Sequence, residues 1–96
     1  MAKLYVIRTF GTADGKGVYY NHPEYGIFGT EQQGYRWLAG LRRELDEEEL
    51  RTARLVEISP DDFDDVLDDV EAHPRRFNSE YYGGLSLKAI QRRIAA

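Results

Sequence analysis

The chain has 96 residues, no cysteine, 31% charged side chains and a formal net charge of −4. A chain of this length predicts a single domain, residues 1–96, with a small hydrophobic core. The acidic balance disfavours the surface as a whole as a binder of nucleic acid or of an anionic membrane. The lack of cysteine excludes a disulfide framework and a thiolate metal site.

The first predicted strand covers residues 4–10, which are rich in β-branched and aromatic side chains. Both faces of this strand are fairly apolar, which indicates a covered and central strand. The apolar run soon reaches Arg8, so it is too short for a signal peptide or a membrane span. We therefore expect a cytoplasmic protein, of a cell or of an infected host.

A hairpin is predicted next, because residues 11–17 contain the turn-forming pair Asp14-Gly15 and residues 18–20 suit a returning antiparallel strand. Residues 25–29 form either a third short strand or an ordered loop. Aromatic side chains gather around this hairpin, either as core residues or as an exposed patch for a partner. They are Tyr19, Tyr20, Tyr25 and Phe28.

Thr30 and Gln33 have the spacing of a capping box, which predicts the start of a helix. Gly34 and Gly40 each cost about 1 kcal/mol relative to alanine in a helix, so we expect them to permit close packing against the sheet. Residues 46–50, four of them acidic, either continue this helix or begin a second one. The buried face is expected to carry Tyr35, Leu38, Leu41 and Leu45.

Residues 54–58 are typical of another strand and lead into the most acidic stretch of the chain, residues 59–71. Ser59 is a favourable N-cap and Pro60 suits the first helical position, so this stretch predicts a helix. Apolar residues follow at i, i+3, i+4 and i+7 and form a narrow stripe for docking. They are Phe63, Val66, Leu67 and Val70.

The remaining surface of this helix is acidic and contains no lysine or arginine. Carboxylates three or four positions apart repel each other by about 0.2–0.5 kcal/mol per pair. Seven carboxylates in residues 61–71 give about one charge per 2 Å of helix, close to the ~1.7 Å of duplex DNA. The face is either a solvated surface or a mimic of a nucleic-acid backbone, extended by residues 44–49 if these lie nearby. The expected partner-binding residues are Asp61, Asp64, Asp65, Asp68, Asp69 and Glu71.

A last helix is predicted after the capping residue Ser86, with Leu87, Ile90 and Ile94 as its buried stripe. Cations and aromatics gather in this C-terminal part of the chain. They are either an ordinary basic helix end or an alternative nucleic-acid-binding module, which would use phosphate contacts and stacking. The residues of this alternative are Arg75, Arg76, Tyr82, Lys88, Arg92 and Arg93.

Motifs for catalysis or cofactor binding are lacking. His22 and His73 have no i,i+4 metal-binding partner, and no serine lies in a Gly-x-Ser-x-Gly turn. The glycine-rich residues 11–17 depart from the spacing of a phosphate-binding loop. We expect no catalytic residue, metal or cofactor; a small enzyme with an unrecognised pocket is the third hypothesis.

The order of elements predicts an α+β domain with a small, mostly antiparallel sheet. This sheet contains a β-hairpin and one or two further strands, with two to four helices packed on one face. The leading functional hypothesis is a small acidic, non-enzymatic protein that binds the basic, nucleic-acid-binding surface of a protein partner. It would act as an inhibitor or regulator, as a phage-type antagonist of a host enzyme would. A homodimer is a further option, formed through any edge or face of the sheet that the helices leave uncovered.

Overall fold

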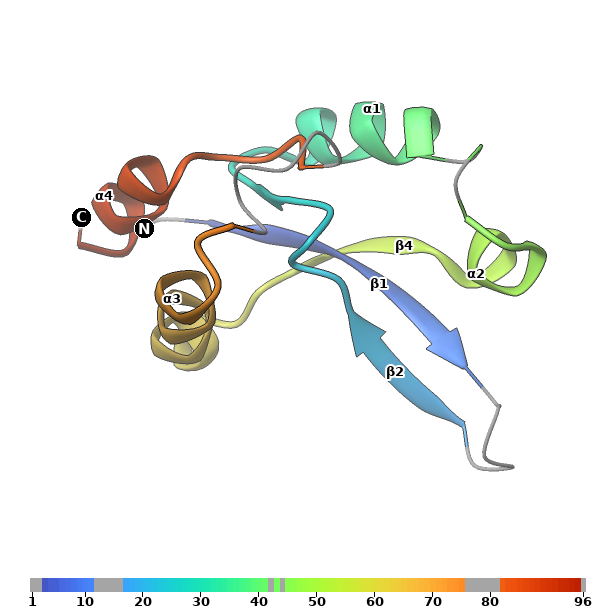
Figure 1. Ribbon diagram of the computed structural model, residues 1–96, viewed down its shortest axis with the longest axis horizontal. Coiled ribbons are helices and arrows are strands. Elements are labelled where there is room, and N and C mark those ends of the chain that lie inside the picture. The colour runs from blue at the N-terminus through green and yellow to red at the C-terminus, as the bar shows by residue number, and fades with distance from the viewer. Residues whose placement is uncertain (1–2, 12–16, 42, 44, 76–81, 96) are drawn as a thin grey trace.

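The computed structural model describes residues 3–11, 17–41, 43, 45–75 and 82–95. Within these ranges an open sheet contains β1 (Tyr5–Gly11), β2 (Val18–Asn21), β3 (Ile27–Phe28) and β4 (Arg54–Glu57). Its helices are α1 (Glu31–Leu41), α2 (Glu47–Thr52), α3 (Phe63–Ala72) and α4 (Leu87–Ala95) (Figure 1). The predicted α+β class and antiparallel sheet are confirmed. The predicted turn at Asp14-Gly15 lies outside the described residues.

β1 is the central strand, as predicted from its two apolar faces, and it pairs antiparallel with each of the other three strands. β4 runs along one edge, where Tyr5 pairs with Glu57 and Arg8 with Arg54. β3 and β2 lie one after the other along the opposite edge, with β3 beside Tyr5 and Val6 and β2 ending beside Arg8. The β1–β2 hairpin extends beyond this region and projects away from the helices (Figure 1).

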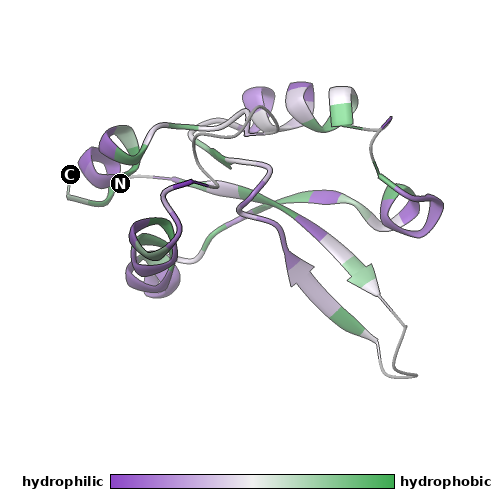
Figure 2. Ribbon diagram, in the orientation of Figure 1, coloured by the Kyte–Doolittle hydropathy of each residue, from purple (hydrophilic) through white to green (hydrophobic). Residues whose placement is uncertain are grey.

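The helices cover both faces of the sheet, so the prediction that they pack on one face is wrong. Successive strand residues point to opposite faces. Tyr5 and Ile7 join one core with α1, whereas Leu4 and Val6 join a second core with Val70 of α3 and Ile90 of α4. Each apolar face of β1 is therefore buried by a different set of helices. Figure 2 shows hydrophobic residues along β1 and β4, between these helices.

The buried stripe of α1 differs from the predicted one. Tyr35 is exposed, and the buried residues of the helix are Gly34, Leu38 and Leu41. A Cβ at Gly34 would lie 2.5 Å from Leu55 Cδ1, so the missing side chain allows α1 to approach β4. Leu45 is buried as expected, although it lies beyond the end of α1. Gly34 therefore occupies the sheet-facing position that the sequence pattern assigned to Tyr35.

The predicted capping residues Thr30, Ser59 and Ser86 accept backbone N–H groups where their helices begin, and Asp46 does so without having been predicted as a cap. Asp46 Oδ1 accepts from Glu49 N at 2.8 Å, which makes α2 a separate short helix. Ser59 caps a single 3₁₀ turn (Pro60–Asp62), which then leads into α3. Ser86 Oγ accepts from Ala89 N at 3.2 Å at the start of α4. No helix in the described ranges is long and apolar enough to cross a membrane.

Candidate partner-binding surface

α3 is attached to the domain through its apolar stripe. Val70 is fully buried in the second core, and Phe63 and Val66 pack against the same core. Leu67, the remaining residue of the predicted stripe, is half-buried. This docking fixes which side of α3 points outward, because helix residues three or four apart share a face.

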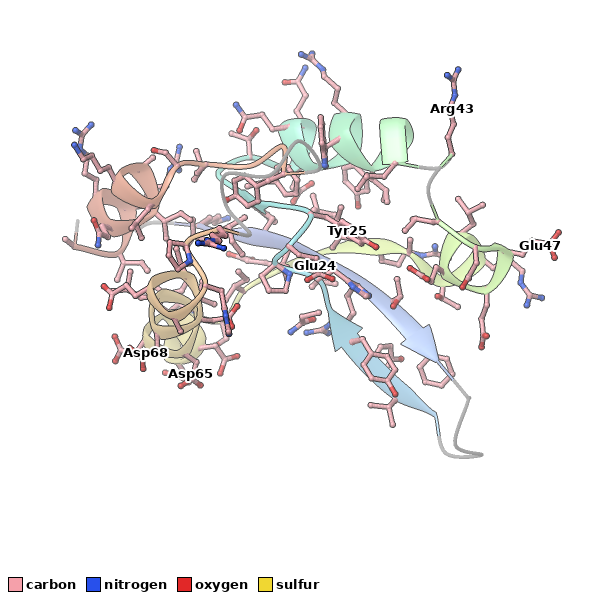
Figure 3. The ribbon with its side chains drawn as sticks, in the orientation of Figure 1. Glu24, Tyr25, Arg43, Glu47, Asp65 and Asp68 are labelled. Atoms are coloured by element: carbon pink, nitrogen blue, oxygen red, sulfur yellow. The ribbon has the colours of Figure 1, made fainter. Side chains whose placement is uncertain are left out.

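The outward side of α3 and of the preceding 3₁₀ turn carries the acidic face. Asp69 is half-buried, and the other members are exposed. Figure 3 shows Asp68 pointing away from the body of the domain. Among the described residues, the one ion pair made by this face joins His73 Nε2 to Asp69 Oδ1 at 3.9 Å. The face consists of Asp61, Asp62, Asp64, Asp65, Asp68, Asp69 and Glu71.

A cleft of about 420 Å³ lies between α3 and the adjoining face of the sheet. We call it the α3 cleft. Three members of the acidic face, Asp62, Asp65 and Asp69, line its helix side, and Glu57 adds a carboxylate from β4. Its apolar lining comes from β1, β3, β4 and α3. These residues are Val6, Ile27, Val56 and Val66, and Pro23 after β2 and Ile58 after β4 add to them.

Arg8 is the one cation among the described residues that line the α3 cleft. Its Nε–H donates a hydrogen bond to Asn21 Oδ1 at 2.8 Å. Its guanidinium also lies over the Tyr19 ring, 5.7 Å from the centroid. These contacts hold Arg8 to the hairpin, and the structure gives it no ion pair with the described carboxylates of the α3 cleft.

The acidic residues of α2 do not extend the acidic face. α2 and α3 lie towards opposite ends of the longest axis of the domain (Figure 1). Figure 3 accordingly shows Glu47 far from Asp65 and Asp68. Glu44, the first residue of the expected extension, lies outside the described residues. The carboxylates of Asp46 and Glu49 instead belong to a second polar group near Tyr25.

This second group is built around His22, which sequence reasoning did not select. His22 Nε2 and Thr9 Oγ1 are 2.7 Å apart, and His22 Nδ1 hydrogen bonds to Glu24 Oε1 at 2.8 Å. The imidazole also stacks on Tyr25, with ring centroids 5.2 Å apart. Burial raises the pKa of the Tyr25 hydroxyl, and the carboxylate of Glu49 raises it further. Burial and the neighbouring Asp46 also raise the pKa of Glu49.

The connectivity of Thr9, His22 and Glu24 is that of a hydroxyl–imidazole–carboxylate triad. Thr9 is only 4% exposed, however, and lies in the central strand, so its hydroxyl offers little access to a substrate. The group therefore resembles a structural link between β1 and the chain that follows β2. The one sequence signal for it is the hairpin register, which places His22 diagonally across from Thr9.

The residues of the alternative nucleic-acid-binding module have different environments. Arg75, Lys88 and Arg92 are exposed, whereas Arg76 lies outside the described residues. The Tyr82 hydroxyl accepts from Ile27 N at 3.3 Å and donates to the carbonyl oxygen of Leu85. Arg93 Nη1 donates to the carbonyl oxygen of Gly29 at 3.4 Å. Tyr82 and Arg93 thus take part in packing.

The aromatic residues around the hairpin are divided between core and surface. Phe28 is fully buried and Tyr25 packs at the edge of the first core. Tyr19 is 68% exposed and Tyr20 46% exposed. On the exposed hairpin, Tyr19 contacts Phe10 with a centroid distance of 5.0 Å.

No group of three or more His, Asp and Glu residues in the described part of the chain is arranged to hold a metal ion. No protein-family model, curated protein or solved structure matches this chain.

Proposed function

We propose that this chain is a small acidic binding protein, which uses the acidic face of α3 to engage the basic surface of a protein partner. The orientation of α3 is the observation that most strongly supports this proposal. Its apolar stripe is docked in the second core, while its carboxylates point outward with one long ion pair among the described residues. A surface of uncompensated negative charge attracts a positively charged one and accelerates their encounter.

The spacing of the carboxylates supports a partner that ordinarily binds nucleic acid. A basic groove that binds duplex DNA is adapted to about one negative charge per ~1.7 Å. The acidic face offers a similar density along one short helix. The protein would compete with nucleic acid for such a groove and so inhibit or regulate its partner.

Affinity capture from the native host tests this proposal. The bait is the full chain, and the matched control replaces the six predicted contact residues with their amides: D61N, D64N, D65N, D68N, D69N and E71Q. We expect the wild-type chain to retain a basic, nucleic-acid-binding protein that the control does not retain. The proposal is wrong if both baits retain the same proteins to the same extent.

The alternative nucleic-acid-binding module remains a prediction with less support. It requires Tyr82 for stacking, but this ring packs against the second core and its hydroxyl is hydrogen bonded on both sides. The module predicts retention on DNA or RNA at low salt that R92A together with K88A abolishes. Homodimerisation through a sheet edge also remains a prediction, as does a small enzyme.

A further inference from the structure

We infer that the α3 cleft receives a cationic side chain, arginine or lysine, together with a neighbouring apolar side chain from the contact segment of the partner. This inference rests on the proposed function and deepens it. It assigns recognition to one concave site, whereas the proposed function requires only an acidic surface.

The size and lining of the α3 cleft support this occupant. Its volume of about 420 Å³ lies within the range of about 300–1,000 Å³ that is typical of ligand sites. Val6, Val56 and Val66 provide an apolar surface, and Asp62, Asp65 and Asp69 provide the charged side. Long cationic side chains combine the same two properties, an aliphatic stem and a charged end. A partner segment with both kinds of side chain would therefore match the cleft.

The charges in the cleft are not neutralised from within the described chain. Among the described residues, four carboxylates line it, against the single guanidinium of Arg8. These carboxylates belong to Asp62, Asp65, Asp69 and Glu57. Arg8 is held by Asn21 and Tyr19 on the hairpin. Its fixed position leaves the helix side of the cleft negative, so an incoming cation is favoured and an anion is disfavoured.

The acidic face contains a matched control for this inference. Asp62, Asp65 and Asp69 line the α3 cleft, whereas the neighbouring residues Asp61, Asp64 and Asp68 do not. Replacing either set with asparagine removes the same charge from the same stretch of chain. If the partner is held by diffuse charge, both sets of substitutions should weaken its binding equally. If it is held inside the cleft, substitution of Asp62, Asp65 and Asp69 should weaken binding more.

The test uses three synthetic hexapeptides, titrated into the full chain and followed by amide and methyl NMR. One peptide alternates leucine and arginine, the second alternates serine and arginine, and the third alternates leucine and glutamate. The proteins are the wild type, D62N/D65N/D69N and D61N/D64N/D68N. The amide spectrum of each variant is first compared with that of the wild type to check that the variant is folded.

We expect the leucine–arginine peptide to bind and to shift the methyl resonances of Val56 and Val66. Its affinity should fall roughly tenfold in D62N/D65N/D69N and less than about threefold in D61N/D64N/D68N. The serine–arginine peptide should bind several-fold more weakly because it cannot cover the apolar lining, and the leucine–glutamate peptide should not bind.

Equal losses in the two variants, equal affinity of the two arginine peptides, or no binding to the wild type would each overturn the inference. The same two variants serve as baits for the host partner, which separates this result from the proposed function. If both variants lose the partner equally and the peptide result is negative, the inference fails and the proposed function stands. If neither variant loses the partner, the proposed function fails as well.

Discussion

At the scale of single residues, Tyr82 shows how one buried hydroxyl connects distant segments. It joins β3 to the segment before α4, through hydrogen bonds with Ile27 N and the Leu85 carbonyl oxygen. Burial raises the pKa of Tyr82 to about 12, an effect that the hydrogen bond from Ile27 partly opposes. The folded chain therefore holds this proton more tightly than the unfolded chain does.

The first prediction concerns Y82F, which should lower the free energy of unfolding by about 1–2 kcal/mol near pH 9, because two hydrogen bonds are lost. An unfolded tyrosine loses its proton near pH 10, whereas Tyr82 keeps it until about pH 12 in the folded state. The contribution of the hydroxyl is thus complete below pH ~10 and is lost as the pH rises towards ~12. Urea titrations should show the difference in free energy of unfolding between wild type and Y82F narrowing by about 1–2 kcal/mol between pH ~9 and ~11.5. A constant difference would contradict this account.

Residue-scale features were predictable where their causes are local. Thr30, Ser59 and Ser86 act at helix starts as predicted, and each accepts a hydrogen bond from a backbone N–H two or three positions away. The contacts of His22 were not predictable in this way. They depend on the register of β1 and β2 and on the path of the chain after Asn21, which propensities do not specify.

At the scale of elements, the two glycines of α1 show how packing overrides helix propensity. Gly34 and Gly40 carry the same intrinsic cost, yet a Cβ at Gly34 would meet Leu55 at 2.5 Å and a Cβ at Gly40 would meet nothing within 4 Å. Spacing alone could not separate them, because the apolar series suggested that Tyr35 faces the sheet.

The second prediction compares G40A with G34A. G40A should raise the free energy of unfolding by about 0.5–1 kcal/mol through helix propensity. G34A gains the same propensity but overpacks the contact with Leu55, which costs about 1–3 kcal/mol, so its net effect should be destabilising by about 1 kcal/mol. Chemical denaturation measures both variants. Equal stabilisation by both would show that α1 does not depend on the close approach at Gly34.

The third prediction concerns charge repulsion on α3. Asp68 lies three or four positions from Asp64, Asp65 and Glu71, all of them acidic. D68K should raise the free energy of unfolding by about 1 kcal/mol at low salt, because three repulsive pairs become attractive. D68N should give roughly half of this gain, since it only removes repulsion. Both gains should shrink in ~1 M salt, and a gain that salt does not change would argue against an electrostatic cause.

At the scale of the whole molecule, the sequence predicted the fold class but not the arrangement of helices. Apolar residues on both sides of β1 predicted a buried central strand. Burying both sides requires helices on both faces of the sheet. The same limit applies to the candidate site. The acidic face follows from helix periodicity, but the α3 cleft depends on how α3 lies against β1 and β4. Helix periodicity does not specify that placement.

The central claim is that the acidic face takes the place of nucleic acid on a basic partner. Its most direct test is competition, in which duplex DNA of random sequence is added to the complex of this chain with its captured partner. We predict that DNA displaces the chain from its partner. We also predict that the affinity of the chain for the partner falls about tenfold or more between ~50 and ~200 mM salt. A complex that survives saturating DNA and is insensitive to salt would contradict the claim.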